Sequence, residues 1–215
     1  MTAVTAPAPW HREYSGRLAG SVYAVDPAAR ISAARTLRDA GLGVHVDVMA
    51  EGEGLPAGVG AAELAGIAAE TGPSGFDVHL IGSAAFVDAA LARVLAHRPD
   101  KVFLPWAAFT AERADAVRAA GASAWIALWE EWDGAGAPPW RATPDGVLVM
   151  LIEPGTRDRC AVERLDIVRA LATDHSVIVD GGVTKGIAPL CIRAGAEAMV
   201  AGRALLPAPV DGKES

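Results

Sequence analysis

The chain has 215 residues, of which 52% are hydrophobic and 21% are charged, and its net charge is −7 at pH 7. This composition is typical of a globular chain with one large or two small domains. The acidic balance argues against a nucleic-acid partner or an acidic membrane surface, because both require a basic footprint. No run reaches the roughly eighteen apolar residues of a membrane span. The two cysteines form no CxxC motif or disulfide framework, so we expect a reducing, cytoplasmic setting.

Apolar runs divide the chain into a regular series of predicted elements. Residues 1–17 show no periodicity, and we expect a flexible segment there, then a single domain over residues 18–207 and a tail at 208–215. Helices are predicted in most gaps between strands, with Asp26 and Thr110 as N-caps, while residues 130–143 form an irregular connection. The strands are predicted at residues 18–24, 44–49, 76–81, 101–106, 124–129, 146–152, 177–180 and 198–201.

Eight strands that alternate with helices predict a parallel sheet. Eight such units closing on themselves give a (β/α)8 TIM barrel, although the chain is somewhat shorter than the typical length of about 250 residues. A doubly wound open sheet is the competing fold. It is disfavoured because no predicted strand leads into a G-x-G-x-x-G turn that opens a helix.

The predicted strand at residues 44–49, which reads VHVDVM, carries the first polar signal. Its valines lie on one face, and His45, Asp47 and Met49 share the other face because side chains alternate along a strand. A histidine and a carboxylate on the inner face of an apolar strand require pairing, hydrogen bonds or a metal ion. A satisfied polar pair in the core is the simpler alternative.

Further polar residues lie on other strands in the same way. Asp77 and His79 share one face of the third strand, and Asp180 ends the seventh, just before two glycines. The barrel fold places its chemistry at the carboxyl ends of strands, so His45, Asp47, His79 and Asp180 are expected to converge. Mixed nitrogen and oxygen ligands suit one divalent ion such as Zn, Mn, Fe or Co. Asp77 lies one step deeper, and we expect it to be structural or to support the metal ligands from outside.

Taken together, these motifs resemble the ribulose-phosphate 3-epimerase family, from about residue 18 to residue 206. The matching pieces are SVY at 21–23, HVDVM at 45–49, DVHL at 77–80, VM at 149–150, PG at 154–155, VDGGV at 179–183 and AEAMVAG at 196–202. The resemblance implies a ribulose-phosphate-binding type of TIM barrel.

The resemblance also implies roles for individual residues. It makes His45, Asp47, His79 and Asp180 the metal ligands, and Asp47 and Asp180 the acid–base pair. The reaction it implies is the removal of a proton beside a ketone and its return to the opposite face through an enediolate. The implied substrate-binding residues are Ser21, Met49, Met150, Gly155, Gly181, Gly182, Gly202 and Arg203.

The sequence departs from the family pattern around the implied substrate. The glycine-rich loop after the sixth strand is replaced by EPGTRDR at residues 153–159. A phosphate group could be bound by Arg157, Arg159 or Arg203, because guanidinium groups suit phosphate. In the alternative interpretation, these arginines are solvated loop residues without a ligand. Trp106 and Trp129 either reshape the mouth of the barrel or pack its rim.

We therefore expect an isomerase, a metal-dependent ketose-phosphate 3-epimerase-like enzyme. Its partner would be a sugar phosphate or related ketose, without nucleic acid or membrane, and the chain would form a homo-oligomer. One alternative is a diverged epimerase or isomerase that acts on a modified or unphosphorylated sugar. Others are a related phosphate-binding barrel that decarboxylates or isomerises, and a metal-binding barrel without catalysis. The Asp-x-Lys-x-x-Asp motif of such decarboxylases is absent, and the retention of both Asp47 and Asp180 argues against an inactive barrel.

Overall fold

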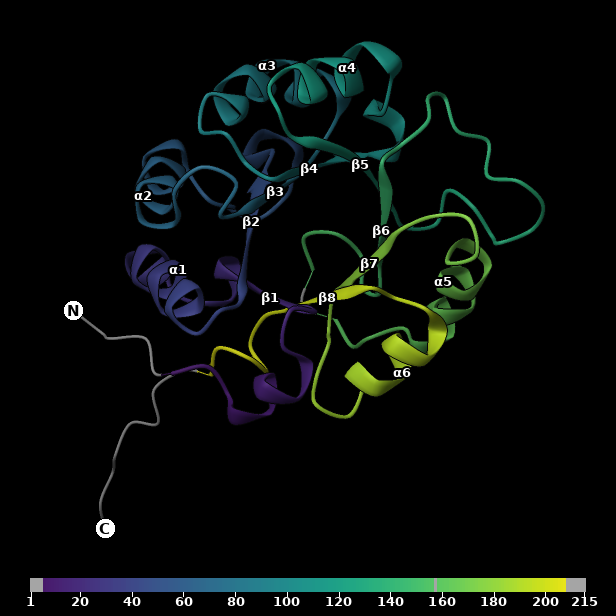
Figure 1. Cartoon of the computed structure of the whole chain (residues 1–215). Coiled ribbons are helices and arrows are strands. Elements are labelled where there is room, and N and C mark those ends of the chain that lie inside the picture. The colour runs from purple at the N-terminus through teal and green to yellow at the C-terminus, as the bar shows by residue number, and fades with distance from the viewer. Residues whose placement is uncertain (1–5, 157, 208–215) are drawn as a thin grey trace.

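The computed structural model describes residues 6–156 and 158–207, and its centre is a closed barrel of eight parallel strands. The strands follow one another around the barrel in chain order, and β8 closes the ring by pairing with β1 (Figure 1). The strands are β1 (Leu18–Ser21), β2 (Gly43–Met49), β3 (Asp77–Ile81), β4 (Lys101–Pro105), β5 (Ser123–Leu128), β6 (Gly146–Met150), β7 (Val177–Asp180) and β8 (Ala198–Ala201). The predicted (β/α)8 barrel is thus confirmed, and the open doubly wound sheet is wrong.

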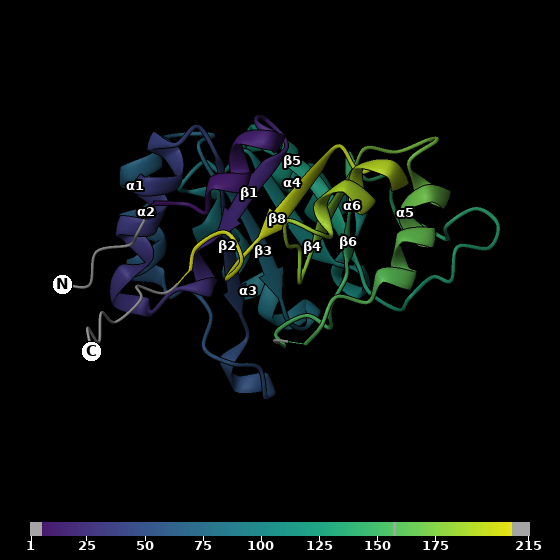
Figure 2. The ribbon, with the colours of Figure 1, turned by 90° about the horizontal axis from the view of Figure 1, so that it is seen from below.

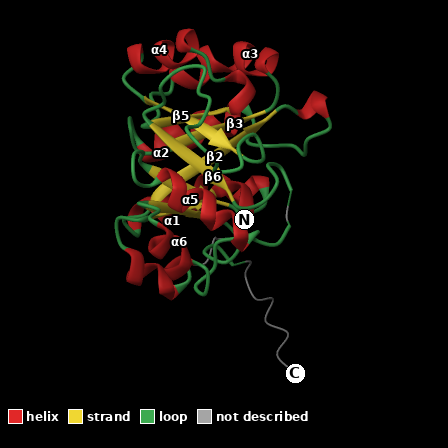
Figure 3. Cartoon of the chain, turned by 90° about the vertical axis from the view of Figure 1, so that its right-hand side faces the viewer, coloured by secondary structure: helices red, strands yellow, loops and turns green. Residues whose placement is uncertain are grey.

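Helices surround the barrel and cover the apolar outer faces of the strands (Figures 1 and 3). No α-helix joins β5 to β6; this connection is the irregular one that the sequence predicts over residues 130–143. The α-helices are α1 (Arg30–Asp39), α2 (Ala61–Thr71), α3 (Ala84–Leu95), α4 (Ala111–Ala119), α5 (Leu165–Leu171) and α6 (Ala188–Ala194). None of the helices in the described part of the chain has the length and apolar character needed to cross a membrane.

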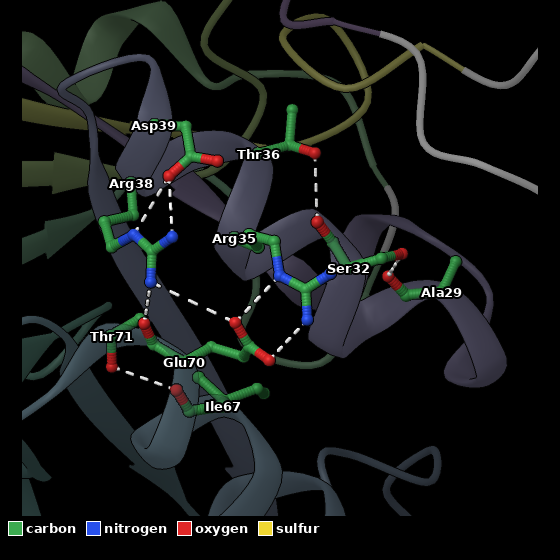
Figure 4. Close-up of polar contacts among 9 residues, drawn as sticks. All are labelled: Ala29, Ser32, Arg35, Thr36, Arg38, Asp39, Ile67, Glu70 and Thr71. Carbon is green, nitrogen blue, oxygen red and sulfur yellow. Dashed lines mark hydrogen bonds and ion pairs between the residues drawn. The ribbon is translucent and has the colours of Figure 1, made fainter.

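Ion pairs on the outer surface join α1 to α2. Arg35 donates from Nε to Glu70 Oε2 at 2.8 Å, and Arg38 donates to the Glu70 carbonyl and to Asp39 (Figure 4). Both arginines are solvent-exposed, so these contacts contribute little stability. The apolar contacts of α1 and α2 beneath them hold the pair to the barrel.

Two local predictions differ from the structure. Asp26 makes no capping hydrogen bond, because the chain enters α1 through a short 3-10 helix at Pro27–Ala29. The segment predicted to be flexible at residues 1–17 contains a 3-10 helix at Pro9–Tyr14 within its described part. Trp10 there is buried, and its indole N–H donates to the Ala204 carbonyl. A buried tryptophan therefore anchors this segment to the chain that follows β8.

Two loops project from the carboxyl end of the barrel, above the predicted site. One follows β2 and contains the 3-10 helix η4 (Glu51–Glu53), and the other follows β6. Both extend from the same end of the barrel in Figure 2. They also meet, because a Cβ atom built on Gly155 would lie 3.1 Å from Leu55. Glu53 accepts hydrogen bonds from the Ser83 N–H and hydroxyl, which fixes the first loop to the start of α3.

Candidate metal centre and cavity

Four side chains converge inside the carboxyl half of the barrel: His45 and Asp47 from β2, His79 from β3 and Asp180 from the end of β7. One ligand atom from each lies within 4.8 Å of those from the other three. His79 is in register with Asp47 on the neighbouring strand, which brings the second imidazole to the same level. The structure thus brings together the four residues that the sequence analysis selected.

The two histidines of the cluster are buried, and the nitrogens that face the carboxylates lack the hydrogen bonds that buried polar groups normally have. His45 Nε2 lies 3.4 Å from Asp47 Oδ1 and 3.8 Å from Asp180 Oδ2, while His79 Nδ1 lies 3.4 Å from Asp47 Oδ1. Neither nitrogen has a hydrogen-bond partner among the described residues. Buried nitrogens without partners are rare, but a divalent cation would bind both of them together with the two carboxylates. The residues present therefore fit a metal ion.

Electrostatics keep the metal-free cluster partly protonated. Burial lowers the pKa of His45, but the charges of Asp47 and Asp180 outweigh burial and raise it to about 9. Burial also raises the pKa of Asp47, yet attraction to the two histidines brings it well below its usual range. Burial raises the pKa of Asp180 to about 6, because the nearby Asp47 carboxylate opposes a second negative charge and the histidines compensate only in part.

The two carboxylate oxygens of Asp47 have different neighbours, and Ser21 binds one of them. Its hydroxyl donates a hydrogen bond of 2.7 Å to Asp47 Oδ2, and both side chains are buried. Asp47 Oδ1, in contrast, faces the nitrogens of His45 and His79. The two oxygens of this carboxylate are thus differentiated, with one toward the imidazoles and one held by Ser21.

A cavity of about 530 Å³ opens directly onto the cluster. Its volume lies within the range of about 300–1,000 Å³ that is usual for small-molecule sites. All the residues implied to bind substrate line it, and so do both aspartates that are implied to be catalytic. The predicted residues in its wall are Ser21, Asp47, Met49, Met150, Gly155, Asp180, Gly181, Gly182, Gly202 and Arg203.

Several cavity residues were not selected from the sequence. Tyr23 follows β1, and Thr184 and Ile187 lie between β7 and α6. Sequence motifs single out the strand ends, whereas these side chains reach the cavity through loop geometry. Of the three arginines singled out by sequence, Arg159 and Arg203 line the cavity, and Arg157 lies outside the described residues.

The two tryptophans at the ends of β4 and β5 do not line this cavity. The ring of Trp106 packs against that of Trp140, with centroids 5.0 Å apart. Trp129 lies under the Arg164 guanidinium, 4.3 Å from the ring centroid. Arg164 also donates to the carbonyls of Met150 and Trp129, so it joins the ends of β5 and β6. These contacts favour the alternative in which both tryptophans pack the rim of the barrel.

Fold and site together define a class: a (β/α)8 barrel that carries a buried His/Asp cluster at the carboxyl ends of its strands. The model of the ribulose-phosphate 3-epimerase family matches residues 17–206. The chain therefore belongs to this family, as its motifs indicated. No curated protein sequence matches the chain at a significant level.

Solved structures with the same architecture have different chemistries. Phosphoribosyl anthranilate isomerase from Thermus thermophilus is 15% identical with a TM-score of 0.63, over 87% of this chain and 88% of that one. Orotidine 5'-phosphate decarboxylase from Pyrococcus horikoshii is 16% identical with a TM-score of 0.58, and the match covers 89% of this chain and 92% of the decarboxylase. Mandelate oxidase is 20% identical with a TM-score of 0.57, over 94% and 69%. At these identities the likeness shows the fold alone.

Proposed function

We propose that the protein is a metal-dependent ketose-phosphate 3-epimerase-like isomerase. The observation that carries the proposal is the buried cluster of two imidazoles and two carboxylates, whose inner nitrogens have no hydrogen-bond partner among the described residues, at the floor of a cavity. His45, Asp47, His79 and Asp180 would hold one divalent ion. When bound, that ion would offset the negative charge that develops on the substrate oxygens.

The two aspartates perform the proton transfers in this proposal. Epimerisation removes the proton from the carbon beside a ketone and returns one to the other face through an enediolate. Asp47 comes from β2 and Asp180 from β7, so their carboxylates reach the substrate from different strands. One carboxylate accepts the proton while the other donates one, and they exchange roles when the reaction runs in reverse. Ser21 holds Asp47 Oδ2 in a fixed orientation during these steps.

The substrate carries an anionic group at the outer part of the cavity in this proposal. Arg159 and Arg203 line the cavity, as do Gly181 and Gly182. Planar guanidinium groups suit phosphate because they donate two parallel hydrogen bonds. Asp158 also lines this region, and its negative charge favours the alternative of an unphosphorylated or modified sugar. Assays of Arg159→Met and Arg203→Met on phosphorylated and free ketoses distinguish a phosphorylated from an unphosphorylated substrate. If an arginine contacts a phosphate group, its loss should weaken the binding of the phosphorylated ketose selectively.

Solvent deuterium incorporation into a panel of ketose phosphates and free ketoses tests the reaction. Asp47→Asn and Asp180→Asn should each slow incorporation at the epimerised carbon by about 10²–10⁴-fold, the usual contribution of a general acid or base. Asp115→Asn is the control, since it removes an exposed carboxylate that does not line the cavity. Incorporation at the wild-type rate in either active-site variant would refute the assigned roles. The cytoplasmic setting and the homo-oligomer stay predictions.

A further inference from the structure

An aromatic ring lies against both histidines of the metal cluster. Phe103 of β4 is the register partner of His79 on β3, so both side chains point into the barrel. The Phe103 side chain is fully buried. Its ring centroid lies 5.4 Å from that of His45 and 6.2 Å from that of His79. Both distances fall within the range of about 4.5–7 Å that is usual for interacting aromatic rings. One phenyl ring therefore packs against two candidate metal ligands.

The His45 ring has no hydrogen bond that would orient it from its outer side. Histidines that bind a metal through one nitrogen almost always donate the other N–H to a carboxylate, a carbonyl or a water. Nε2 of His45 faces Asp47 and Asp180, whereas Nδ1 is buried and has no hydrogen-bond partner among the described residues. The carboxylate of Asp77, the register partner of His45 on β3, is paired with Lys101 at 3.5 Å. The orientation of the His45 ring must therefore come from packing.

The ring of Phe103 is itself held in place by Trp125. This residue of β5 is the register partner of Phe103, and the two ring centroids lie 5.7 Å apart with an interplanar angle of 71°. Gly146 on β6 leaves room for the indole, since a Cβ atom there would lie 2.4 Å from the Trp125 ring. Phe103 and Trp125 belong to one buried apolar cluster. Close packing of this kind leaves the Phe103 ring little freedom to move.

We propose that Phe103 is a positioning residue for the metal centre. Its ring is tilted by 43° to the His45 ring and stands nearly perpendicular to the His79 ring, at 81°. Edge-to-face and offset arrangements are the favourable ones for aromatic pairs. The phenyl ring thus holds both imidazoles with one nitrogen toward the Asp47 carboxylate. Ligands fixed in advance lose less freedom on binding an ion, so the site binds it more tightly. The inference deepens the proposed function and rests on its metal site.

Metal affinity and the spectrum of the bound ion test this role without any assay of turnover. We would titrate the full-length metal-free protein with Zn²⁺ against a chromophoric chelator, and record the visible spectrum of the Co²⁺-loaded form. Phe103→Leu keeps an apolar side chain but removes the ring. It should weaken Zn²⁺ binding by about tenfold, at the lower end of the usual effect of losing a group that orients a metal ligand. It should also shift the Co²⁺ bands, because the two imidazoles are no longer fixed.

Phe109→Leu is the matched control, because Phe109 is equally buried but belongs to the larger apolar cluster that excludes Phe103. Urea unfolding of both variants measures how much stability each one loses. If Phe103→Leu does not fold, Phe103→Met takes its place, since a flexible methionine fills irregular gaps. Zn²⁺ affinity within twofold of the wild type with unchanged Co²⁺ bands, or an equal loss of affinity in Phe109→Leu, would overturn the role of Phe103.

A crystal structure of the zinc-loaded wild type keeps the test decisive whatever the variants do. The proposal predicts that the Phe103 ring stays against both imidazoles and that His45 Nδ1 has no acceptor within hydrogen-bond distance. A water or carbonyl bound to this nitrogen, or a His45 ring turned away from Phe103, would contradict the proposal. A wild-type protein that binds no metal would overturn the proposed function itself, so the two failures are distinguishable.

Discussion

Metal loading should release a proton from the buried cluster near neutral pH. Burial lowers the pKa of His45, but Asp47 and Asp180 raise it to about 9, so the metal-free imidazole is a cation at pH 7.5. Its Nε2 faces the two carboxylates, which is the position that the ion would take. The ion must therefore displace this proton, because only neutral histidine binds a metal.

The size of the effect follows from the same pKa. At pH 7 the cation outnumbers the neutral form by about 100 to 1, because the pH lies two units below the pKa. The apparent association constant should therefore rise about tenfold for each pH unit up to about pH 9 and then level off. About one proton should leave per ion bound at pH 7.5, and about half a proton at pH 9.

Calorimetric titration in buffers of different ionisation enthalpy counts these protons directly. The metal would be delivered from a weak chelator so that it stays in solution at high pH. His97→Asn is the control, because it removes a histidine that lies outside the cluster. Release of no proton at pH 7.5, or an affinity that does not change between pH 7 and pH 8.5, would refute the electrostatic description of the site.

Three further predictions concern other parts of the structure. Ser21→Ala removes a buried hydrogen bond to a carboxylate; such bonds contribute about 1.5–3 kcal/mol, so deuterium incorporation should slow by about 10- to 150-fold, and Ser21→Thr should restore much of it. Gly20→Ala places a Cβ atom 2.4 Å from a fully buried leucine and should reduce the free energy of unfolding in urea by roughly 1–3 kcal/mol, whereas Gly52→Ala, with no neighbour within 4 Å, should not. The raised pKa of His45 stabilises the metal-free fold, and this stabilisation is fully present below the unfolded-state pKa of about 6.5 and is lost as the pH rises through about 9. The melting temperature of the metal-free wild type should therefore fall over this pH range. The same fall should be absent in His45→Asn.

The fold and the cluster of two histidines and two aspartates could be predicted because both follow from strand periodicity. Alternation along β2 and β3 places His45, Asp47 and His79 on one face, and parallel strands bring their carboxyl ends to one end of the barrel. The apolar runs specify eight strands, and their alternation with helices fixes the parallel order. The wall of the cavity that opens onto the cluster was predictable where it consists of residues at strand ends.

The remaining features depend on contacts between segments that are distant in sequence. Trp10 is buried because it meets the chain after β8, and no local pattern indicates that contact. Trp129 packs beneath Arg164, which lies 35 residues later in the chain. Periodicity specifies which face of a strand a residue occupies, but such contacts depend on how distant parts of the chain meet in the closed barrel.

The most direct measurement is an anomalous-diffraction map of crystals grown with Mn²⁺ or Zn²⁺. The account predicts one strong peak at about 2.0–2.2 Å from His45 Nε2, His79 Nδ1 and one oxygen each of Asp47 and Asp180, as is usual for such ligands. A peak elsewhere, or no peak at this cluster in crystals that hold the metal, would contradict the central claim that these four side chains form the metal centre.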